Sequence, residues 1–142
     1  MLNASYFFVL TEIYNHTKTS SRQIAISRFR QLTEGQNFHN LKKENQSTYA
    51  NPKRTQDTIY KRLKYDTQCG TVVNVRKSMC IHPKVDRVLS IREAARLQSF
   101  PHSYIFKGTK DAQYQQVGNA VPPLLGKAIA EAVLEVLEGK NI

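Results

Sequence analysis

The residues whose types and spacing most suggest ligand binding lie near the C-terminal end, in the segment Gly118-Asn-Ala-Val-Pro-Pro123. A glycine turn here leads into a helix that begins at a proline. Such a junction leaves backbone amides free to face a ligand. Spacing alone favours the alternative, which is an ordinary connection between a loop and a helix.

A second set of candidates is basic. The 142 residues contain 21 Lys and Arg against 11 Asp and Glu, for a net charge of +10. The excess is concentrated in the middle, because residues 18–92 hold 16 basic and 5 acidic side chains. Such a concentration indicates a polyanionic partner such as duplex DNA, and a solvated basic face without a partner is the alternative.

Within this basic region, two short segments lie at the ends of expected strands. Arginine can bind phosphate or pair with guanine edges, and hydroxyl and amide side chains can contact bases or phosphates. For each of these side chains, a solvated surface role is the alternative. The candidate DNA-binding residues are Arg54, Thr55, Gln56, Arg76, Lys77 and Ser78.

The elements that would position these side chains are short strands. Residues 59–63, 71–75 and 79–81 are rich in β-branched or apolar residues and are flanked by turn residues, which predicts three strands. Residues 4–13 are also apolar, but too few to distinguish a helix from a strand. We therefore expect a small, loop-rich β subdomain whose loops carry the binding function.

Two helices are expected after the strands. Ser90-Ile-Arg-Glu93 fits a capping box, and Phe100-Pro101 ends the helix that it starts. In residues 124–137, pairs of apolar residues recur every four positions, with Pro122 or Pro123 in the first turn and Gly139 just past the end. Because this apolar face is continuous, we expect it to be buried. Most of the chain is polar loop and basic strand, so the sequence favours a second polypeptide as the partner of this face.

Some classes of protein are not indicated. Cys69 and Cys80 are isolated thiols without metal-ligand spacing, so no metal site is expected. No apolar run approaches the length of about 20 residues that a membrane span needs, and no secretory signal is visible. We expect a cytoplasmic protein with reduced thiols and no membrane partner.

Two ordered blocks resemble a known family. Residues 87–101, Arg-Val-Leu-Ser-Ile-Arg-Glu-Ala-Ala-Arg-Leu-Gln-Ser-Phe-Pro, are similar to the ninth motif of DNA (cytosine-5)-methyltransferases, and residues 114–123 resemble the tenth. Residues 28–38 and 54–60 resemble the family's target-recognition region. The resemblance implies an unassigned segment over 1–26, a target-recognition region over 27–86 and the two motifs with the terminal helix over 87–142.

The resemblance implies roles for particular residues. Asn119, Ala120 and Val121 would line the site of the methyl donor, S-adenosylmethionine, and the terminal helix would dock on the domain that holds it. His102 replaces the Asp that usually follows Phe-Pro in the family, and we expect it to alter local helix capping only. Structural roles at the hinge would fall to Arg87, Arg92, Glu93 and Arg96.

No catalytic residue is expected in this chain. The family's nucleophile lies in a Pro-Cys pair and its cofactor loop in a Gly-x-Gly turn. Here no proline precedes a cysteine, and no two glycines are two residues apart. The resemblance therefore implies the C-terminal subunit or fragment of a methyltransferase from a prokaryotic restriction–modification system, associated with the nucleoid and inactive without an N-terminal partner.

The expected fold class is α+β, with a β recognition subdomain followed by two helices. The second helix would pack on the doubly wound α/β domain of the N-terminal part. Another hypothesis is a catalytically dead DNA-binding remnant of a truncated or frameshifted gene. A basic interaction module that only resembles the family is a third.

Overall fold

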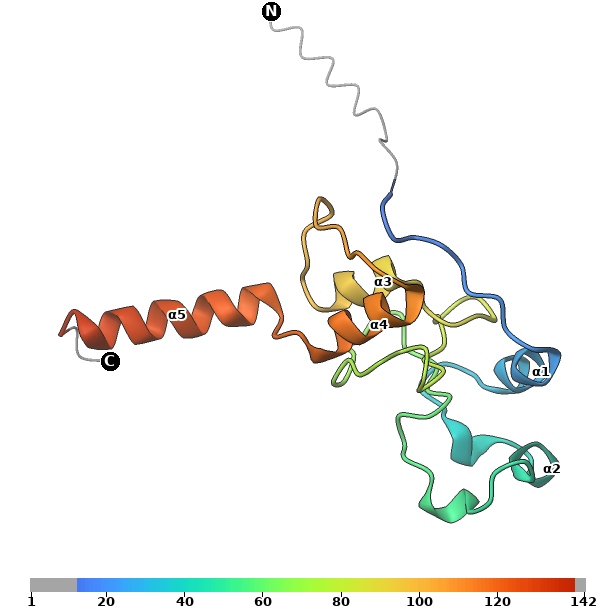
Figure 1. The fold of residues 1–142 in the computed structure, drawn as a ribbon. Helices are drawn as coiled ribbons and strands as arrows, with labels where there is room; N and C mark the ends of the chain where they lie inside the picture. The colour runs from blue at the N-terminus through green and yellow to red at the C-terminus, as the bar shows by residue number, and fades with distance from the viewer. Residues whose placement is uncertain (1–12, 140–142) are drawn as a thin grey trace, which may run out of the picture.

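The computed structural model describes residues 13–139, and the regular secondary structure in this range is helical. The expected element over residues 4–13 lies, except for Ile13, outside the described residues. Five α-helices and two single-turn 3₁₀ helices follow one another along the chain (Figure 1). They are α1 (Gln23–Gln31), η1 (Phe38–Asn40), α2 (Lys43–Gln46), η2 (Pro52–Arg54), α3 (Ile91–Leu97), α4 (Lys110–Asn119) and α5 (Pro123–Leu137).

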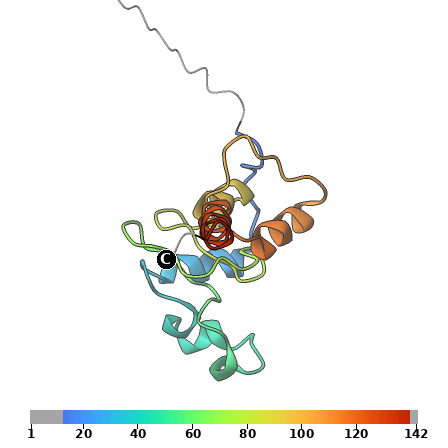
Figure 2. The same cartoon turned by 90° about the vertical axis from the view of Figure 1, so that its left-hand side faces the viewer.

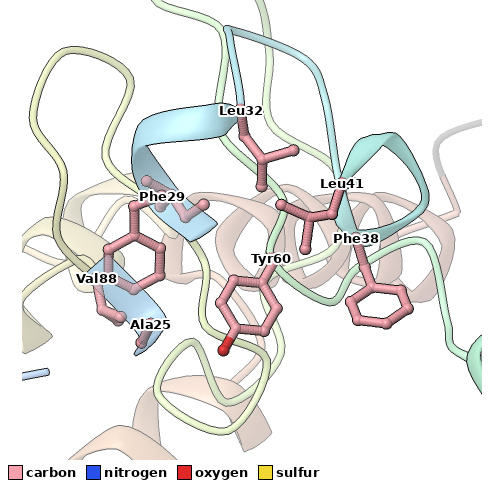
Figure 3. Packing of buried hydrophobic residues seen from close by; sticks show 8 residues of the cluster. Ala25, Phe29, Leu32, Phe38, Leu41, Tyr60 and Val88 are labelled. Atoms are coloured by element: carbon pink, nitrogen blue, oxygen red, sulfur yellow. The ribbon is translucent and has the colours of Figure 1, made fainter. Parts of the chain in front are cut away.

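An N-terminal core cluster forms where α1 packs against the segments around η1 and Tyr60. Ala25 and Phe29 lie one turn apart on α1, so one face of this helix is buried. Figure 3 shows Tyr60 between Phe29 and Phe38, with ring centroids 5.8 Å and 6.4 Å away respectively. The cluster consists of Ala25, Phe29, Leu32, Phe38, Leu41, Tyr60, Ile81 and Val88.

A second cluster joins α3 and α4, and we call it the motif cluster. Ile91, Ala94 and Ala95 are buried on the face of α3 that the sequence predicts, together with Gln98. Tyr114 and Val117 supply the buried face of α4. The members of the motif cluster are Val75, Leu89, Ile91, Ala94, Ala95, Phe106, Tyr114 and Val117.

The prediction of three strands is wrong for the described part of the chain, which holds only isolated bridges. Arg62 pairs with Ile81 in parallel, and Ile81 pairs with Val88 in antiparallel. Tyr60 and Met79 have φ angles of 52° and 54°, in the left-handed region, so neither 59–63 nor 79–81 is continuously extended. The β subdomain is therefore replaced by irregular segments that side chains and scattered backbone hydrogen bonds hold together, such as that from the Ile81 amide to the Lys61 carbonyl oxygen at 2.8 Å.

The remaining expected strand, over residues 71–75, is absent for a different reason. In residues 71–75, Val72 and Val75 face the motif cluster and Val73 is exposed, so the side chains that face the cluster are three positions apart and do not alternate as in a strand. The segment lies against helix α4, whose backbone hydrogen bonds are used within the helix, so it cannot pair with the segment as a neighbouring strand would. The apolar residues of this segment therefore pack in the motif cluster and do not pair in a sheet.

Both predicted helices are confirmed, as α3 and α5, while α1 and α4 were not anticipated. Helix α5 begins at Pro123, and Gly139 beyond its C-terminus has a φ of 70°, as expected for a helix end. Figure 1 shows α5 projecting from the body, and Figure 2 shows it end-on. No residue of α5 is buried. Among the described helices, none combines the length and apolarity that crossing a membrane requires.

Candidate functional site

The start of α3 is fixed by the capping box that the sequence predicts. The Glu93 amide donates to Ser90 Oγ at 3.2 Å, and the Ser90 amide donates to Glu93 Oε2 at 2.8 Å. Arg87 adds a two-pronged ion pair, with both guanidinium nitrogens 2.7 Å from the Glu93 carboxylate. Burial opposes ionisation of Glu93, but the hydrogen bonds from Arg87 and from the Ser90 amide outweigh it and lower its pKa to about 2. Glu93 is thus a fixed anion at neutral pH.

Arg92 lies at the centre of the ninth-motif segment and is fully buried. Its guanidinium donates to the carbonyl oxygens of Tyr14, Pro101 and Tyr104. These contacts tie α3 to the loop after it and to the N-terminal segment. Arg96, in contrast, is exposed, and its Nη2 lies 3.2 Å from Nδ1 of His102.

Residues 15–19 also form part of this site, although no motif in the sequence predicts a role for them. Asn15 Nδ2 donates to the carbonyl oxygen of Phe106 and to Gln113 Oε1, both at 2.9 Å. His16 Nδ1 lies 2.9 Å from Ser90 Oγ, and Thr19 Oγ1 lies 2.9 Å from the Tyr114 hydroxyl. Such long-range polar contacts have no periodicity, so no sequence pattern could have revealed them.

Helix α4 carries the tenth-motif segment, and its glycine is required by packing. Gly118 lies inside α4, whereas the sequence suggested a turn. A Cβ at this position would lie 2.8 Å from the backbone nitrogen of Asn74 and 3.0 Å from the carbonyl carbon of Val73. Asn74 Nδ2 also donates to Gln115 Oε1 at 3.0 Å. The glycine therefore permits close contact between α4 and residues 73–74.

The three residues predicted to face the cofactor form the connection between α4 and α5. Asn119 is the last residue of α4 and is exposed, and its Oδ1 accepts from Gln115 Nε2 at 2.7 Å. Ala120 has an extended backbone, and Val121 is exposed. The structure thus presents Asn119 and Val121 on the surface at the base of the projecting helix.

The first group of DNA-binding candidates lies at η2. Arg54 and Gln56 are exposed, whereas Thr55 is half-buried and its carbonyl oxygen lies 2.8 Å from His39 Nε2. Within the described residues, no hydrogen bond or ion pair joins residues 54–56 to residues 76–78. The two groups therefore belong to separate surface segments.

The second group divides by burial. Lys77 is exposed, and Arg76 forms an ion pair with Asp111 of α4. Ser78 is buried, and its hydroxyl has no hydrogen-bond partner among the described residues. Ser78 therefore does not share the exposed surface of Lys77.

Ser78 instead lines a cavity of about 400 Å³, together with Cys69 and Cys80. Burial raises the pKa of both thiols, that of Cys80 to about 12. Because the thiolate is the reactive form, neither cysteine is an activated nucleophile at neutral pH. The described residues contain no cluster of His, Cys, Asp and Glu suited to a metal ion.

A second cavity, of about 590 Å³, lies beside the N-terminus of α1, and we call it the α1 cavity. Arg22, Arg28 and Arg76 line it, along with hydroxyl side chains that include Ser20 and Thr48. Sequence reasoning missed Arg22 and Arg28. The sequence signals near them were the excess of basic residues over 18–92 and, for Arg28, the resemblance of residues 28–38 to the target-recognition region.

Comparisons with known proteins agree with the motifs. Residues 2–135 match the family model of the C-5 cytosine-specific DNA methylase, so the match includes most of the first 26 residues, for which no resemblance was expected. The type II methyltransferase M.DdeI of Desulfomicrobium norvegicum is 34% identical over 93% of this chain and 35% of its own length.

Other relatives are similar to this chain over only about half of its length. The type II methyltransferase M.AgeI of Thalassovita gelatinovora is 51% identical over 52% of this chain and 18% of its own length. DNA (cytosine-5)-methyltransferase 3 of Arabidopsis thaliana is 50% identical over 45% of this chain and 5% of its own length. The chain thus spans about a third or less of these relatives. Its match over nearly the whole sequence places it in the C-5 cytosine-specific DNA methylase family.

Proposed function

We propose that this chain is the C-terminal part of a DNA (cytosine-5)-methyltransferase, which transfers a methyl group from S-adenosylmethionine to C5 of a cytosine in duplex DNA. The observation that carries the proposal is the exposed apolar face of α5, which directly follows a tenth-motif segment in which Asn119 and Val121 are also exposed. An apolar stripe of this length indicates a protein partner. An N-terminal methyltransferase part with a cofactor-binding domain would cover it.

The cofactor site would be shared with that N-terminal part. Neither of the two cavities described above includes Asn119, Ala120 or Val121. Their exposure fits one wall of a site that another domain completes. The Asn119 side chain would offer a polar contact, and Val121 an apolar one. Arg87, Arg92 and Glu93 would hold this wall rigidly against the recognition region.

Binding of duplex DNA would fall to the basic region. Arg54, Gln56 and Lys77 are exposed and can reach phosphates or base edges without rearrangement. Arg76 would first exchange Asp111 for a phosphate. Thr55 and Ser78 are less accessible, so we propose supporting roles for them.

The alternative is a DNA-binding remnant without activity, which the basic surface alone also supports. Reconstitution separates the two hypotheses. The chain is assayed alone and after co-expression with an N-terminal polypeptide that carries a Pro-Cys pair and a Gly-x-Gly loop. We expect methylation of C5 only in the second case. DNA binding without methylation in both cases would favour the remnant.

A matched pair of substitutions tests the role of α5. Ile129 and Leu134 are both apolar and similarly exposed, at 53% and 55%, but only Ile129 lies on the predicted stripe. Ile129→Asp would bury an unpaired charge in the interface, at a cost of several kcal/mol. We expect Ile129→Asp to abolish co-purification with the N-terminal part and Leu134→Asp to preserve it. Normal assembly of Ile129→Asp would contradict the proposal.

The cofactor assignment has its own test in the reconstituted enzyme. Asn119→Ala removes an exposed polar group without touching the apolar stripe. We expect normal assembly and a raised KM for S-adenosylmethionine. If both KM and kcat are unchanged, Asn119 does not contribute to the cofactor site.

A further inference from the structure

The α1 cavity contains a buried charge that no acidic side chain of the described residues neutralises. Three arginines are buried in the described part of the chain, and Arg28 is one of them, with 4% of its surface exposed. A buried guanidinium normally has a carboxylate partner or a complete set of acceptors, because an uncompensated buried charge is costly. The three arginines differ in how this requirement is met.

Arg62 and Arg92 are satisfied by the protein itself. Arg62 pairs with Asp86 at 2.5 Å and also donates to the carbonyl oxygens of Leu32 and Phe29. Arg92 is enclosed by carbonyl oxygens, as described above. Neither arginine lines either of the two cavities. Both are therefore internal structural groups.

Arg28 is held in place but remains incompletely paired. Its Nε donates to the carbonyl oxygen of Asn45 at 2.9 Å, Nη1 donates to the Tyr60 hydroxyl at 3.0 Å, and Nη2 donates to the Thr48 hydroxyl. A guanidinium has five N–H donors. One N–H on each terminal nitrogen thus has no partner in the described part of the chain. Its charge also forms no ion pair there.

Two aromatic rings fix the orientation of this guanidinium. The Arg28 Cζ atom lies 5.5 Å from the ring centroid of Tyr49 and 5.3 Å from that of Tyr60. These cation–π contacts stabilise the charge but occupy neither of the two N–H groups that lack a partner. Arg28 is therefore a preorganised donor at the wall of a cavity.

The rest of the cavity has the same electrostatic character. Its described lining includes Arg22 and Arg76 but no Asp or Glu, and Arg76 is paired with Asp111 outside that lining. Arg22 is exposed and is the N-cap residue of α1, which has neither a side-chain cap nor an acidic residue in its first turn. The positive end of the helix dipole therefore faces the same space. Hydroxyl donors from residues 19–21 and from Thr48 complete the set.

We propose that the α1 cavity binds a phosphate group, with Arg28 as the central ligand. A phosphate oxygen pair matches the two unused N–H groups of a planar guanidinium, and its charge supplies the missing counter-ion. Arg22, the hydroxyls and the α1 amides would contact the remaining oxygens. The phosphate is either one of a DNA backbone or that of a free phosphorylated small molecule. Only the first source rests on the proposed function.

The first arm of the test uses inorganic phosphate and the full chain. Phosphate is titrated at constant ionic strength, and binding is followed by the ³¹P resonance. Arg22→Gln removes an exposed cation from the cavity, and Arg28→Lys keeps the charge but loses the fork geometry. Arg30→Gln is the matched control, because Arg30 lies on α1, is exposed, and does not line the cavity. We expect saturable binding in the parent chain and in Arg30→Gln, and at least tenfold weaker binding in the other two variants.

The second arm measures duplex DNA binding across a series of salt concentrations with the same variants. If the cavity holds a backbone phosphate, Arg28→Lys and Arg22→Gln weaken binding to all sequences equally. Arg22→Gln also reduces the slope of log K against log salt by up to about 0.9, the value for one phosphate contact, whereas Arg28→Lys keeps the charge and the slope. Unchanged DNA binding with a positive first arm identifies a free phosphorylated ligand instead.

The proposal is overturned if Arg22→Gln binds phosphate as tightly as Arg30→Gln. That comparison remains decisive if Arg28→Lys, which loses buried hydrogen bonds, does not fold. The first arm requires neither cofactor nor methyl transfer. Phosphate binding with failed methylation would therefore refute the proposed function alone, and methylation without phosphate binding would refute only this site.

Discussion

At the scale of the residue, buried polar side chains replace the backbone ladders that a sheet would provide. Arg62 and Arg92 each gather carbonyl oxygens from segments that are distant in sequence. The Arg87–Glu93 pair fixes the start of α3 in a similar way. Irregular segments leave many backbone acceptors unpaired, and a guanidinium with five donors can satisfy several of them at once.

Glu93 provides a prediction at this scale. Glu93→Gln removes the charge that accepts from Arg87 and Ser90, so we expect the free energy of unfolding at pH 7 to fall by about 2–4 kcal/mol. The pKa of Glu93 is lowered from 4.5 to about 2 on folding. Its contribution is therefore complete above pH 4.5 and disappears as the pH falls toward 2.

The measurement is denaturant unfolding of the parent chain and the Gln variant between pH 7 and pH 2. The difference between them should shrink in the acid range. Glu131→Gln is the control, because Glu131 is exposed on α5 and pairs with Lys127 at 3.6 Å. That change should cost less than about 0.5 kcal/mol. A difference for Glu93→Gln that is independent of pH would show that ionisation is not the cause.

At the scale of the element, α4 and α5 are contrasting helices. Helix α4 is short, buries Tyr114 and Val117, and contacts residues 73–74 through Gly118. Helix α5 is long and apolar, and it buries no residue within this chain. Each helix also contains one glycine, Gly118 in α4 and Gly126 in α5. Because the surroundings of these two glycines differ, the same substitution can be compared at both positions.

The expected effects of Gly→Ala are opposite in the two helices. Alanine favours a helix over glycine by about 1 kcal/mol. At Gly118 the new methyl group would clash with the backbone of Val73 and Asn74, so we expect a net loss of about 1–3 kcal/mol. At Gly126 its nearest contact would be Val121 Cγ1 at 4.0 Å, so the helical preference should prevail.

Chemical denaturation measures the first change, and helical circular dichroism measures the second. Gly118→Ala should lower the unfolding midpoint, while Gly126→Ala should raise the helix content or leave it unchanged. Equal stability of the two variants would mean that α4 does not approach residues 73–74 as closely as described.

At the scale of the whole molecule, charge and apolar surface are separated. The net charge of +10 resides in the middle of the sequence, whereas the exposed apolar residues concentrate on α5. This separation suits a chain that contacts a polyanion with one part and a protein with another.

Salt dependence tests the electrostatic part of this arrangement. We expect duplex DNA to bind the chain with a linear decrease of log K against log salt, because each neutralised phosphate releases counterions. Lys77→Ala should reduce the slope by about 0.9, and Lys127→Ala, on α5, should leave it unchanged. An isotherm that does not change between low and physiological salt would exclude phosphate contacts, and equal effects of the two substitutions would exclude a localised binding surface.

The sequence by itself determined those features that depend on local rules. The capping box at Ser90 and Glu93 was predicted because it requires only residues three positions apart. Helix α5 was predicted because its apolar face repeats with helical period over the whole element. The resemblance to the family rests on two motifs, residues 87–101 and 114–123, each of which is an unbroken stretch of sequence. All of these signals lie within short windows of the chain.

Tertiary structure decided the features that depend on distant neighbours. Residues 71–75 are rich in β-branched side chains, which predicts a strand, but a helix lies where a partner strand would be needed. Gly118 looked like a turn residue, but the approach of Asn74 explains it. Ser78, predicted to contact DNA, is buried, and Arg28, which was not among the candidate DNA-binding residues, lines a cavity. Burial and pairing depend on which segments meet in space, and a single sequence does not encode that in any local pattern.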